Sequence, residues 1–275
     1  MTTAAIDGYL QFLEIRDGEV DIYAETLSGR ESFYRDIEAK PVRSHHVLDR
    51  SVYLRNVTSP GVESGLDEPM AWVVATAKAN QSERFGVELS KLYGRVDLEG
   101  EDRPESIHVV MQETYHTRVL ADVVSIFGLP VPHCPPPAGF RFMIKLMVFS
   151  PFPRRFTMPL VGMSEMMGCV MFRALRDRGM ALFADEPECV ERIRVLFDEI
   201  LADEICHVGL IEAGLGRFGR AVMHGLYRLV GKRMAARSPE FVAAVGREEI
   251  ERRLAESFDQ ARLAAQFPET AYSFQ

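Results

Sequence analysis

The 275-residue chain contains few cysteines, and no two of them are spaced as a metal or redox motif requires. The four are Cys134, Cys169, Cys189 and Cys206. Because none forms a C-x-x-C pair, a zinc ribbon and a thioredoxin-type dithiol are excluded. Scattered cysteines are typical of proteins from a reducing compartment, so we expect a cytoplasmic protein.

Long apolar runs are also absent. The two most apolar segments, Phe142–Phe149 and Met158–Phe172, are interrupted by Lys145 and Glu165. Neither reaches the roughly 18 uninterrupted apolar residues that a membrane-spanning helix needs. Residues 1–12 lack the basic and apolar regions of a signal peptide. We therefore expect neither a transmembrane segment nor secretion.

Positive charge is scarcer than negative charge, and the formal net charge is -8. This excess of acids argues against a large phosphate-binding face, so we expect no nucleic-acid partner. Hydrophobic residues make up 47% and charged residues 26% of the chain, a balance that allows a sizeable buried core. We expect a single domain over residues 1–275.

Helical periodicity dominates the chain from Glu68 onward. Four long helices are expected, over about residues 68–93, 102–127, 159–178 and 185–215, with further helices over about 220–236 and 240–266. The predicted fold is all-α. It is a four-helix bundle over about residues 68–215, with an additional N-terminal helix and C-terminal helices over about 216–266.

The remaining segments are harder to interpret. Within residues 1–65 we expect a short helix over Arg30–Ala39, a break at Pro41 and an extended segment over Ser51–Val57. The proline-rich connection Leu129–Pro153 is too long for an idle loop between bundle helices. We expect it to cover or shape a pocket.

Two Glu-x-x-His tetrads carry the chemistry: Glu113-Thr-Tyr-His116 and Glu204-Ile-Cys-His207. Residues three apart lie on one face of a helix, so each tetrad can present an oxygen and a nitrogen to one metal ion. A single tetrad is more often an ordinary solvated pair. The presence of a second one, on a separate predicted helix, favours a metal site.

Apolar residues share the face of each tetrad. They are Val109, Val110, Leu120 and Val123 around the first, and Phe197, Ile200, Leu201, Val208 and Ile211 around the second. These stripes predict that the tetrads face a core. A buried carboxylate without a partner is costly, and divalent cations would supply the missing charge.

Two further glutamates complete the set. Glu83 shares its helical face with Trp72 and Ala79, whereas Glu88 lies about 140° away around the helix, so we expect Glu83 to point inward and Glu88 outward. Glu165 is the only glutamate between residues 159 and 178 and is surrounded by apolar and small residues. The alternative for Glu165 is a core acid paired with Arg173.

The order Glu83, Glu113-x-x-His116, Glu165, Glu204-x-x-His207 resembles the ferritin-like di-iron carboxylate superfamily over roughly residues 68–215. The resemblance implies that these six residues hold two iron ions, with manganese as an alternative metal. It also implies that Asp203 hydrogen-bonds the non-ligating nitrogen of His116 across the bundle. Gln112 occupies the matching place in the first tetrad and can also hydrogen-bond.

Individual positions separate the branches of that superfamily. Leu120 stands where small subunits of ribonucleotide reductase carry a radical tyrosine, and Tyr115 should point away from the metal face. Cys169 stands where bacterial multicomponent monooxygenases often have a threonine, which leaves open a catalytic role beside the metals or simple core packing. The chain looks most like the p-aminobenzoate N-oxygenases, but Ile200 replaces their third histidine.

The resemblance implies an enzyme that activates dioxygen and oxidises a small organic substrate by hydroxylation or N-oxygenation. It also implies a homodimer that takes its electrons from an external reductase or ferredoxin, because the chain carries no flavin or iron–sulfur motif. Alternatives are an iron-binding or iron-storage protein of the ferritin type and a di-metal oxidase or desaturase. The remaining candidate donors, His45, His46, His108 and His133, are expected at the surface.

Overall fold

The computed structural model describes residues 3–21, 23–92, 104–149, 154–235, 238–267 and 270–274. Secondary structure in these residues is almost entirely helical. The exception is a small antiparallel hairpin in which β1 (Val20–Asp21) pairs with β2 (Thr26–Leu27). The predicted all-α class is confirmed. No helix in the described ranges is both long enough and apolar enough to cross a membrane.

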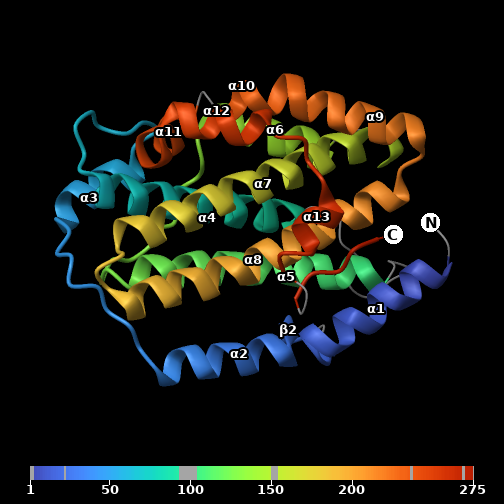
Figure 1. Cartoon of the computed structure of the whole chain (residues 1–275), viewed down its shortest axis with the longest axis horizontal. Coiled ribbons are helices and arrows are strands. Elements are labelled where there is room, and N and C mark those ends of the chain that lie inside the picture. Colours follow the sequence, from blue (N-terminus) through green and yellow to red (C-terminus); the bar gives the residue numbers. More distant parts are fainter. Residues whose placement is uncertain are drawn as a thin grey trace.

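Four long helices form the centre of the molecule. They are α4 (Glu68–Leu92), α5 (Pro104–Ser125), α7 (Arg154–Leu182) and α8 (Pro187–Gly214). The helix α7 packs along α8 and α4 packs along α5, while α5 contacts α8 and α4 contacts α7, so the four close into a bundle. Figure 1 shows them running side by side across the molecule.

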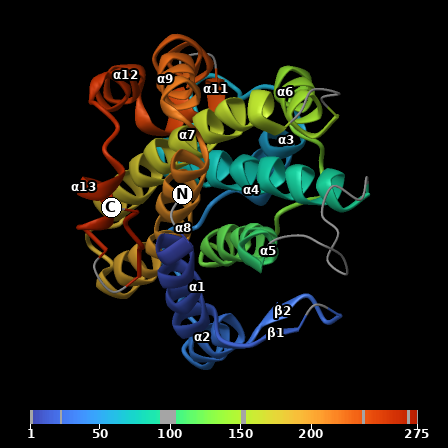
Figure 2. The ribbon, with the colours of Figure 1, turned by 90° about the vertical axis from the view of Figure 1, so that its right-hand side faces the viewer.

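Shorter helices cover two opposite sides of this bundle (Figures 1 and 2). On one side lie α1 (Thr3–Asp17) and α2 (Ser28–Ala39). On the other lie α9 (Arg217–Leu226), the π-helical turn η1 (Tyr227–Gly231), α10 (Lys232–Ala235), α11 (Pro239–Val245) and α12 (Arg247–Ala255). The helices α3 (Arg50–Thr58) and α6 (Ala138–Phe149) pack on α4, and α13 (Gln260–Ala264) packs on α8.

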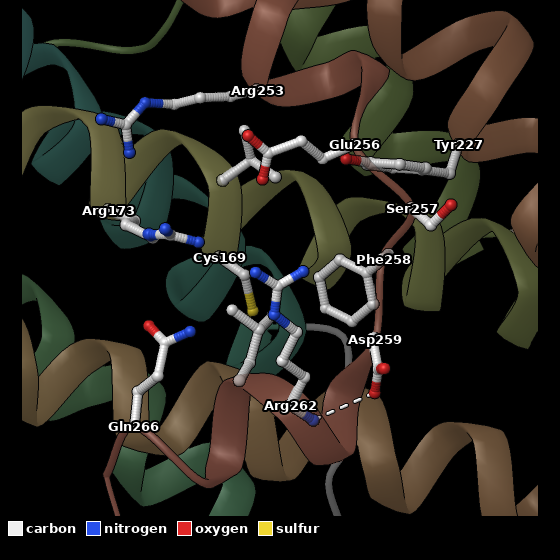
Figure 3. Close-up of a pocket in the computed structure, with 12 residues that line it drawn as sticks. Cys169, Arg173, Tyr227, Arg253, Glu256, Ser257, Phe258, Asp259, Arg262 and Gln266 are labelled. Carbon is white, nitrogen blue, oxygen red and sulfur yellow. Dashed lines mark hydrogen bonds between the residues drawn. The ribbon is translucent and has the colours of Figure 1, made fainter.

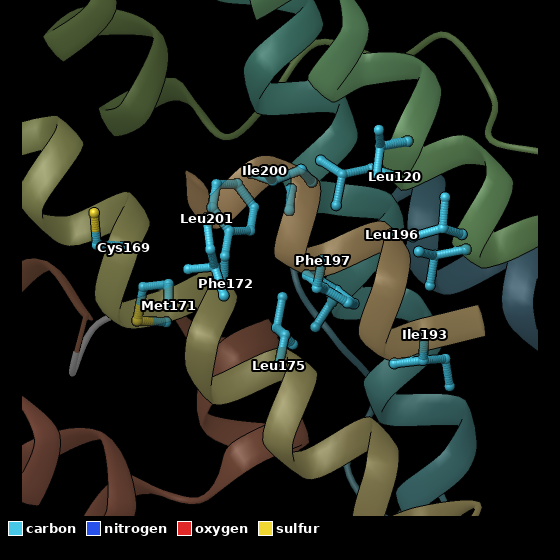
Figure 4. Close-up of a cluster of buried hydrophobic side chains, with 14 of the residues drawn as sticks. Leu120, Cys169, Met171, Phe172, Leu175, Ile193, Leu196, Phe197, Ile200 and Leu201 are labelled. Atoms are coloured by element: carbon cyan, nitrogen blue, oxygen red, sulfur yellow. The ribbon is translucent and has the colours of Figure 1, made fainter. Parts of the chain in front are cut away.

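One end of the bundle is filled with aromatic side chains, which we call the apolar end. Its members are Trp72, Phe127, Phe183 and Phe197. The ring centroids of Phe127, Phe183 and Phe197 lie 6.0, 5.5 and 6.3 Å from that of Trp72. The indole Nε1 donates a 2.7 Å hydrogen bond to the Leu175 carbonyl. Further apolar side chains continue from here along α7 and α8 (Figure 4).

The expected extended segment Ser51–Val57 is wrong, because these residues belong to α3. Val52, Tyr53 and Val57 are residue types that favour strands. Asp49 instead caps the helix, its carboxylate accepting hydrogen bonds from the backbone N–H groups of Ser51 and Val52. Tyr53 and Val57 lie one turn apart on the buried face. A good N-cap and a helical burial pattern outweigh β propensity here.

Other boundaries also differ from the prediction. The proline-rich connection contains α6, which starts directly after Pro137, and α7 begins at Arg154, with Pro159 inside it rather than at its start. The expected helix over 240–266 is three short helices, interrupted at Gly246 (φ +89°) and again before Asp259. The helix α1 was not predicted. Tyr93 and Asp102, proposed as helix ends, lie outside the described residues.

Candidate metal centre

All six predicted ligands come together in the middle of the bundle. Their side chains form two overlapping clusters whose possible ligand atoms lie within 4.8 Å of one another. One cluster contains Glu113, Glu165, Glu204 and His207, and the other contains Glu83, Glu113 and His116. Each of the four long helices supplies at least one carboxylate. We call this set the polar centre.

The two histidines direct their Nδ1 atoms at the carboxylates. His116 Nδ1 lies 3.6 Å from Glu113 Oε2 and 3.4 Å from Glu204 Oε1. His207 Nδ1 lies 3.1 Å from Glu113 Oε1 and 3.5 Å from Glu165 Oε2. Both nitrogens are buried, and neither makes an aligned hydrogen bond within the described residues. The two oxygens of Glu113 thus face different histidines, as a ligand shared by two cations would.

The opposite nitrogen of each ring is fixed by an acceptor. His116 Nε2 donates to Asp203 Oδ2 at 3.1 Å, as predicted, and His207 Nε2 donates to Gln112 Oε1 at 2.9 Å. A carboxylate and an amide oxygen can only accept, so Nε2 carries the hydrogen in both rings. The Nδ1 lone pairs of neutral imidazoles are therefore available to a metal ion, an arrangement common around ligand histidines.

Without cations, protons must balance the charge of the polar centre. Burial, reinforced by Glu113 and Glu204, holds the pKa of Glu83 well above its ordinary value. Burial together with nearby Glu165 raises the pKa of Glu204 to about 8. Burial lowers the pKa of His207, but the adjacent carboxylates outweigh it and raise the pKa to about 10. Divalent cations bound here would displace such protons.

The N-terminal helices hold the partners of the histidines. Arg30 of α2 donates to Asp203 Oδ1 at 2.6 Å and to Asp17 Oδ1 at 2.9 Å, and Arg16 of α1 also pairs with Asp203. Asp17 Oδ2 accepts a 2.8 Å hydrogen bond from the amide of Gln112. Burial raises the pKa of Asp203, but the two arginines outweigh it and hold the pKa well below its ordinary value. Asp203 therefore stays a carboxylate that orients His116.

Sequence reasoning missed Arg16, Asp17 and Arg30, and it was wrong about His108. That histidine is buried, with Nδ1 3.0 Å from Asp17 Oδ2, because α1 covers it. Arg16 and Asp17 lie in a segment without clear periodicity, so nothing in their local sequence indicates a contact with the bundle. The only available signal was the unmatched requirement of Asp203 and Gln112 for partners of their own.

The structure also places four candidates named in the sequence analysis: Glu88, Glu165, Tyr115 and Cys169. Glu88 points outward, with half of its side chain exposed. Glu165 contacts His207, and no ion pair with Arg173 occurs among the described residues. The Tyr115 hydroxyl donates to Glu31 Oε1 at 2.6 Å, away from the polar centre. Cys169 is 3% exposed, and burial together with Glu204 and Glu165 raises the pKa of its thiol.

A glycine on α7 leaves room for the carboxylates of the polar centre. A Cβ placed on Gly168 would lie 2.7 Å from Glu204 Oε2, so glycine lets α7 approach this carboxylate without displacing it. Glu113 and Glu165 keep 21% and 19% of their side chains exposed, whereas His116, His207 and Glu204 are almost fully buried. The ligand set is thus closed on the histidine side and accessible on the side of Glu113 and Glu165.

Comparisons with known proteins found no relative of the chain. No protein-family model, no curated protein and no solved structure matches the chain.

Proposed function

We propose that the chain is a di-iron oxygenase of the ferritin-like type that oxidises a small organic molecule. The observation that carries the proposal is the pair of buried Nδ1 atoms of His116 and His207, which face carboxylates without aligned hydrogen bonds. Four carboxylates and two imidazoles are the donor set of two-metal bundle sites. Mixed oxygen and nitrogen donors also suit manganese, which is the alternative metal.

In this proposal, the residues of the chain hold the metal ions and orient the histidine rings. Glu113 and Glu204 lie within reach of both histidines and would be shared between two cations, while Glu83 and Glu165 would complete one cation each. Asp203 and Gln112 keep the histidine rings in the tautomer that presents Nδ1. The apolar stripes on α5 and α8 keep bulk water away from the histidine side.

The bound iron would supply the electrons and the open coordination positions that activate dioxygen. One oxygen atom enters the substrate and the other leaves as water, with a pair of electrons and a pair of protons consumed. An external reductase or ferredoxin would then return these electrons to the iron, because the sequence carries no flavin or iron–sulfur motif. The more exposed carboxylates Glu113 and Glu165 mark the side from which small molecules reach the centre.

The test loads the metal-free protein with ferrous iron under anaerobic conditions and then measures iron content and dioxygen uptake. We expect about two iron ions per chain and rapid uptake after dioxygen is added. The matched control is the double variant Glu113→Gln with Glu204→Gln, which keeps side-chain size and should lose both iron and uptake. Equal iron content in the double variant and the wild type would reject the proposal.

An iron-storage function is the second candidate, because the same donor set also occurs in ferritin-type bundles. Storage requires a large closed shell with many iron ions per particle. Size-exclusion chromatography combined with iron analysis distinguishes the two. A monomer or dimer with about two iron ions per chain supports the oxygenase, whereas a large particle holding far more iron supports storage.

A further inference from the structure

Two stretches of the sequence contain no acidic residue. They are residues 123–164, which include α6, and residues 213–239, which include α9, η1 and α10. Together they contain ten lysines and arginines, which leaves a charge of -18 for the rest of a chain whose net charge is -8. Both α6 and α9 pack against α7, and they lie on the same side of the bundle in Figures 1 and 2. The fold thus brings two basic segments together on one side.

The inner face of α9 and η1 is firmly packed. Met223 and Tyr227 lie one helical turn apart and are 0% and 3% exposed. Met223 lies so close to Gly162 of α7 that a side chain at that position would collide with it. Tyr227 points inward and lines a small cleft between α7, η1, α12 and α13 (Figure 3). These contacts fix which side of α9 and η1 faces the solvent.

The outer face of the same segment is both apolar and basic. Phe218 and Leu229 are 83% and 64% exposed. They are eleven positions apart, which is about three helical turns, so they lie on nearly the same face. Arg217, Arg220 and Arg228 are exposed next to them. Large apolar side chains exposed among arginines are typical of a surface that binds a partner.

The helix α6 continues this surface. Phe142 and Leu146 lie one turn apart and are 70% and 49% exposed, and Lys145 is exposed between them. We use the name basic apolar surface for the outward side chains of α6, α9 and η1, whose main members are Phe142, Phe218, Leu229, Arg217, Arg220 and Arg228. None of them belongs to the polar centre.

The positive charge of the basic apolar surface is not neutralised by the chain itself. Its arginines form no ion pair within the part of the chain that the structure describes. The acids on the elements next to it are engaged elsewhere, because Glu212 pairs with His224 at 2.7 Å and Glu249 pairs with Arg252 at 2.7 Å. The complementary partner is therefore negatively charged.

A second copy of the chain does not meet this requirement. Most homodimers are two-fold symmetric, so the same surface meets itself across the interface. The arginines of one copy would then face those of the other, and like charges repel. An anionic lipid surface has no such conflict. It also needs no complementary pockets, which suits apolar side chains that protrude separately from α6, α9 and η1.

We propose that the basic apolar surface binds the chain reversibly to an anionic lipid bilayer. Phe142, Phe218 and Leu229 enter the boundary between the headgroups and the acyl chains, as the apolar face of an interfacial helix does. The arginines contact the lipid phosphates, which guanidinium groups bind well. This interaction requires no metal in the polar centre and does not depend on the proposed oxygenase function.

The test is co-sedimentation of the full chain with vesicles made of equal parts of phosphatidylcholine and phosphatidylglycerol, compared with vesicles of phosphatidylcholine alone. We expect binding to the anionic vesicles that weakens as salt is added, because salt screens the attraction. The triple variant Arg217→Gln, Arg220→Gln and Arg228→Gln should bind at least about tenfold more weakly. The matched control changes Arg35, Arg43 and Arg50 to Gln, which lowers the net charge equally at exposed positions elsewhere, and should bind like the wild type.

A second variant tests the apolar contribution. Phe218→Ala removes an exposed side chain, so the fold should be unaffected, and vesicle binding should fall about tenfold. Three results would overturn the proposal: no binding to the anionic vesicles, equal binding to both kinds of vesicle, or equal losses in the two triple variants. Size-exclusion chromatography covers self-association, since conversion of an oligomer into monomers by Phe218→Ala would assign the surface to a second copy instead.

Discussion

The apolar end and the polar centre are built from the same four helices and differ in almost every other respect. At the apolar end, Trp72 and three phenylalanines pack together, and the one polar group of the indole is satisfied by a backbone carbonyl. At the polar centre, six ionisable side chains crowd together, and among the described residues two imidazole nitrogens lack aligned hydrogen bonds. The first arrangement stabilises the chain without any bound ion, whereas the second is unfavourable unless protons or cations balance its charge.

The separation of the apolar end from the polar centre accounts for the length of the four bundle helices. A bundle only as long as the ligand set would consist largely of buried charge, which contributes little stability. The turns beyond these six side chains add buried apolar surface, which stabilises the bundle around the proposed metal site. Changes at the apolar end and at the polar centre should therefore have separable effects on stability and on metal binding.

The largest effect is expected from Trp72→Ala at the apolar end. Removing a fully buried indole and its hydrogen bond to Leu175 should lower the free energy of unfolding by about 3–5 kcal/mol. Urea denaturation of the metal-free protein measures this loss. Iron content of the folded variant should equal that of the wild type. A loss of iron without a loss of stability would contradict the separation of stability from metal binding.

Two glycines of α7 provide a matched comparison. A Cβ on Gly179 would lie 2.4 Å from Trp72 Cζ2, against a rigid and fully packed ring. Gly179→Ala should therefore destabilise the metal-free protein by about 1–3 kcal/mol. Its iron affinity in the folded state should not change.

Gly168→Ala should do the reverse. The added methyl group meets the flexible end of Glu204, whose carboxylate can turn away, and alanine favours the helix by about 0.4–1 kcal/mol. We expect metal-free stability that is equal or higher, together with iron affinity lowered by about tenfold. Urea denaturation and competitive chelation on both alanine variants test the pair, and parallel losses of stability and iron in the two variants would contradict the account.

The smallest effect distinguishes two glutamates of α4. Glu83→Gln removes a ligand from the cluster with Glu113 and His116, so iron content should fall while metal-free stability does not. Glu88→Gln changes a half-exposed side chain and should shift the free energy of unfolding by less than about 0.5 kcal/mol, with normal iron content. Iron analysis on both variants decides, and an equal effect of the two changes would remove Glu83 from the site.

The clustering of the six side chains could be predicted from sequence because helical periodicity fixes which residues share a face. Glu83 and Glu88 differ by about 140° around one helix, so burial of one implies exposure of the other. Apolar residues lie on the same helical face as each tetrad, and they identify the side that faces the core. The four carboxylates and two histidines needed no tertiary information beyond the assumption that the four helices pack together.

The contacts behind the ligands could not be predicted in the same way. Arg30 and Asp203 are 173 positions apart, and nothing in the local sequence of either marks the other as its partner. His108 has an apolar helical context but becomes buried only because α1 lies across it. The α3 error has a different origin, since a single capping residue, Asp49, outweighed the strand propensity of the valines.

The most direct test of the polar centre is a crystal structure of the iron-loaded protein with anomalous scattering measured at the iron edge. We predict two peaks inside the bundle. One should lie among Glu83, Glu113 and His116, and the other among Glu113, Glu165, Glu204 and His207, with both Nδ1 atoms as ligands. A bundle without iron at these positions, or with the iron bound through other residues, would contradict the account.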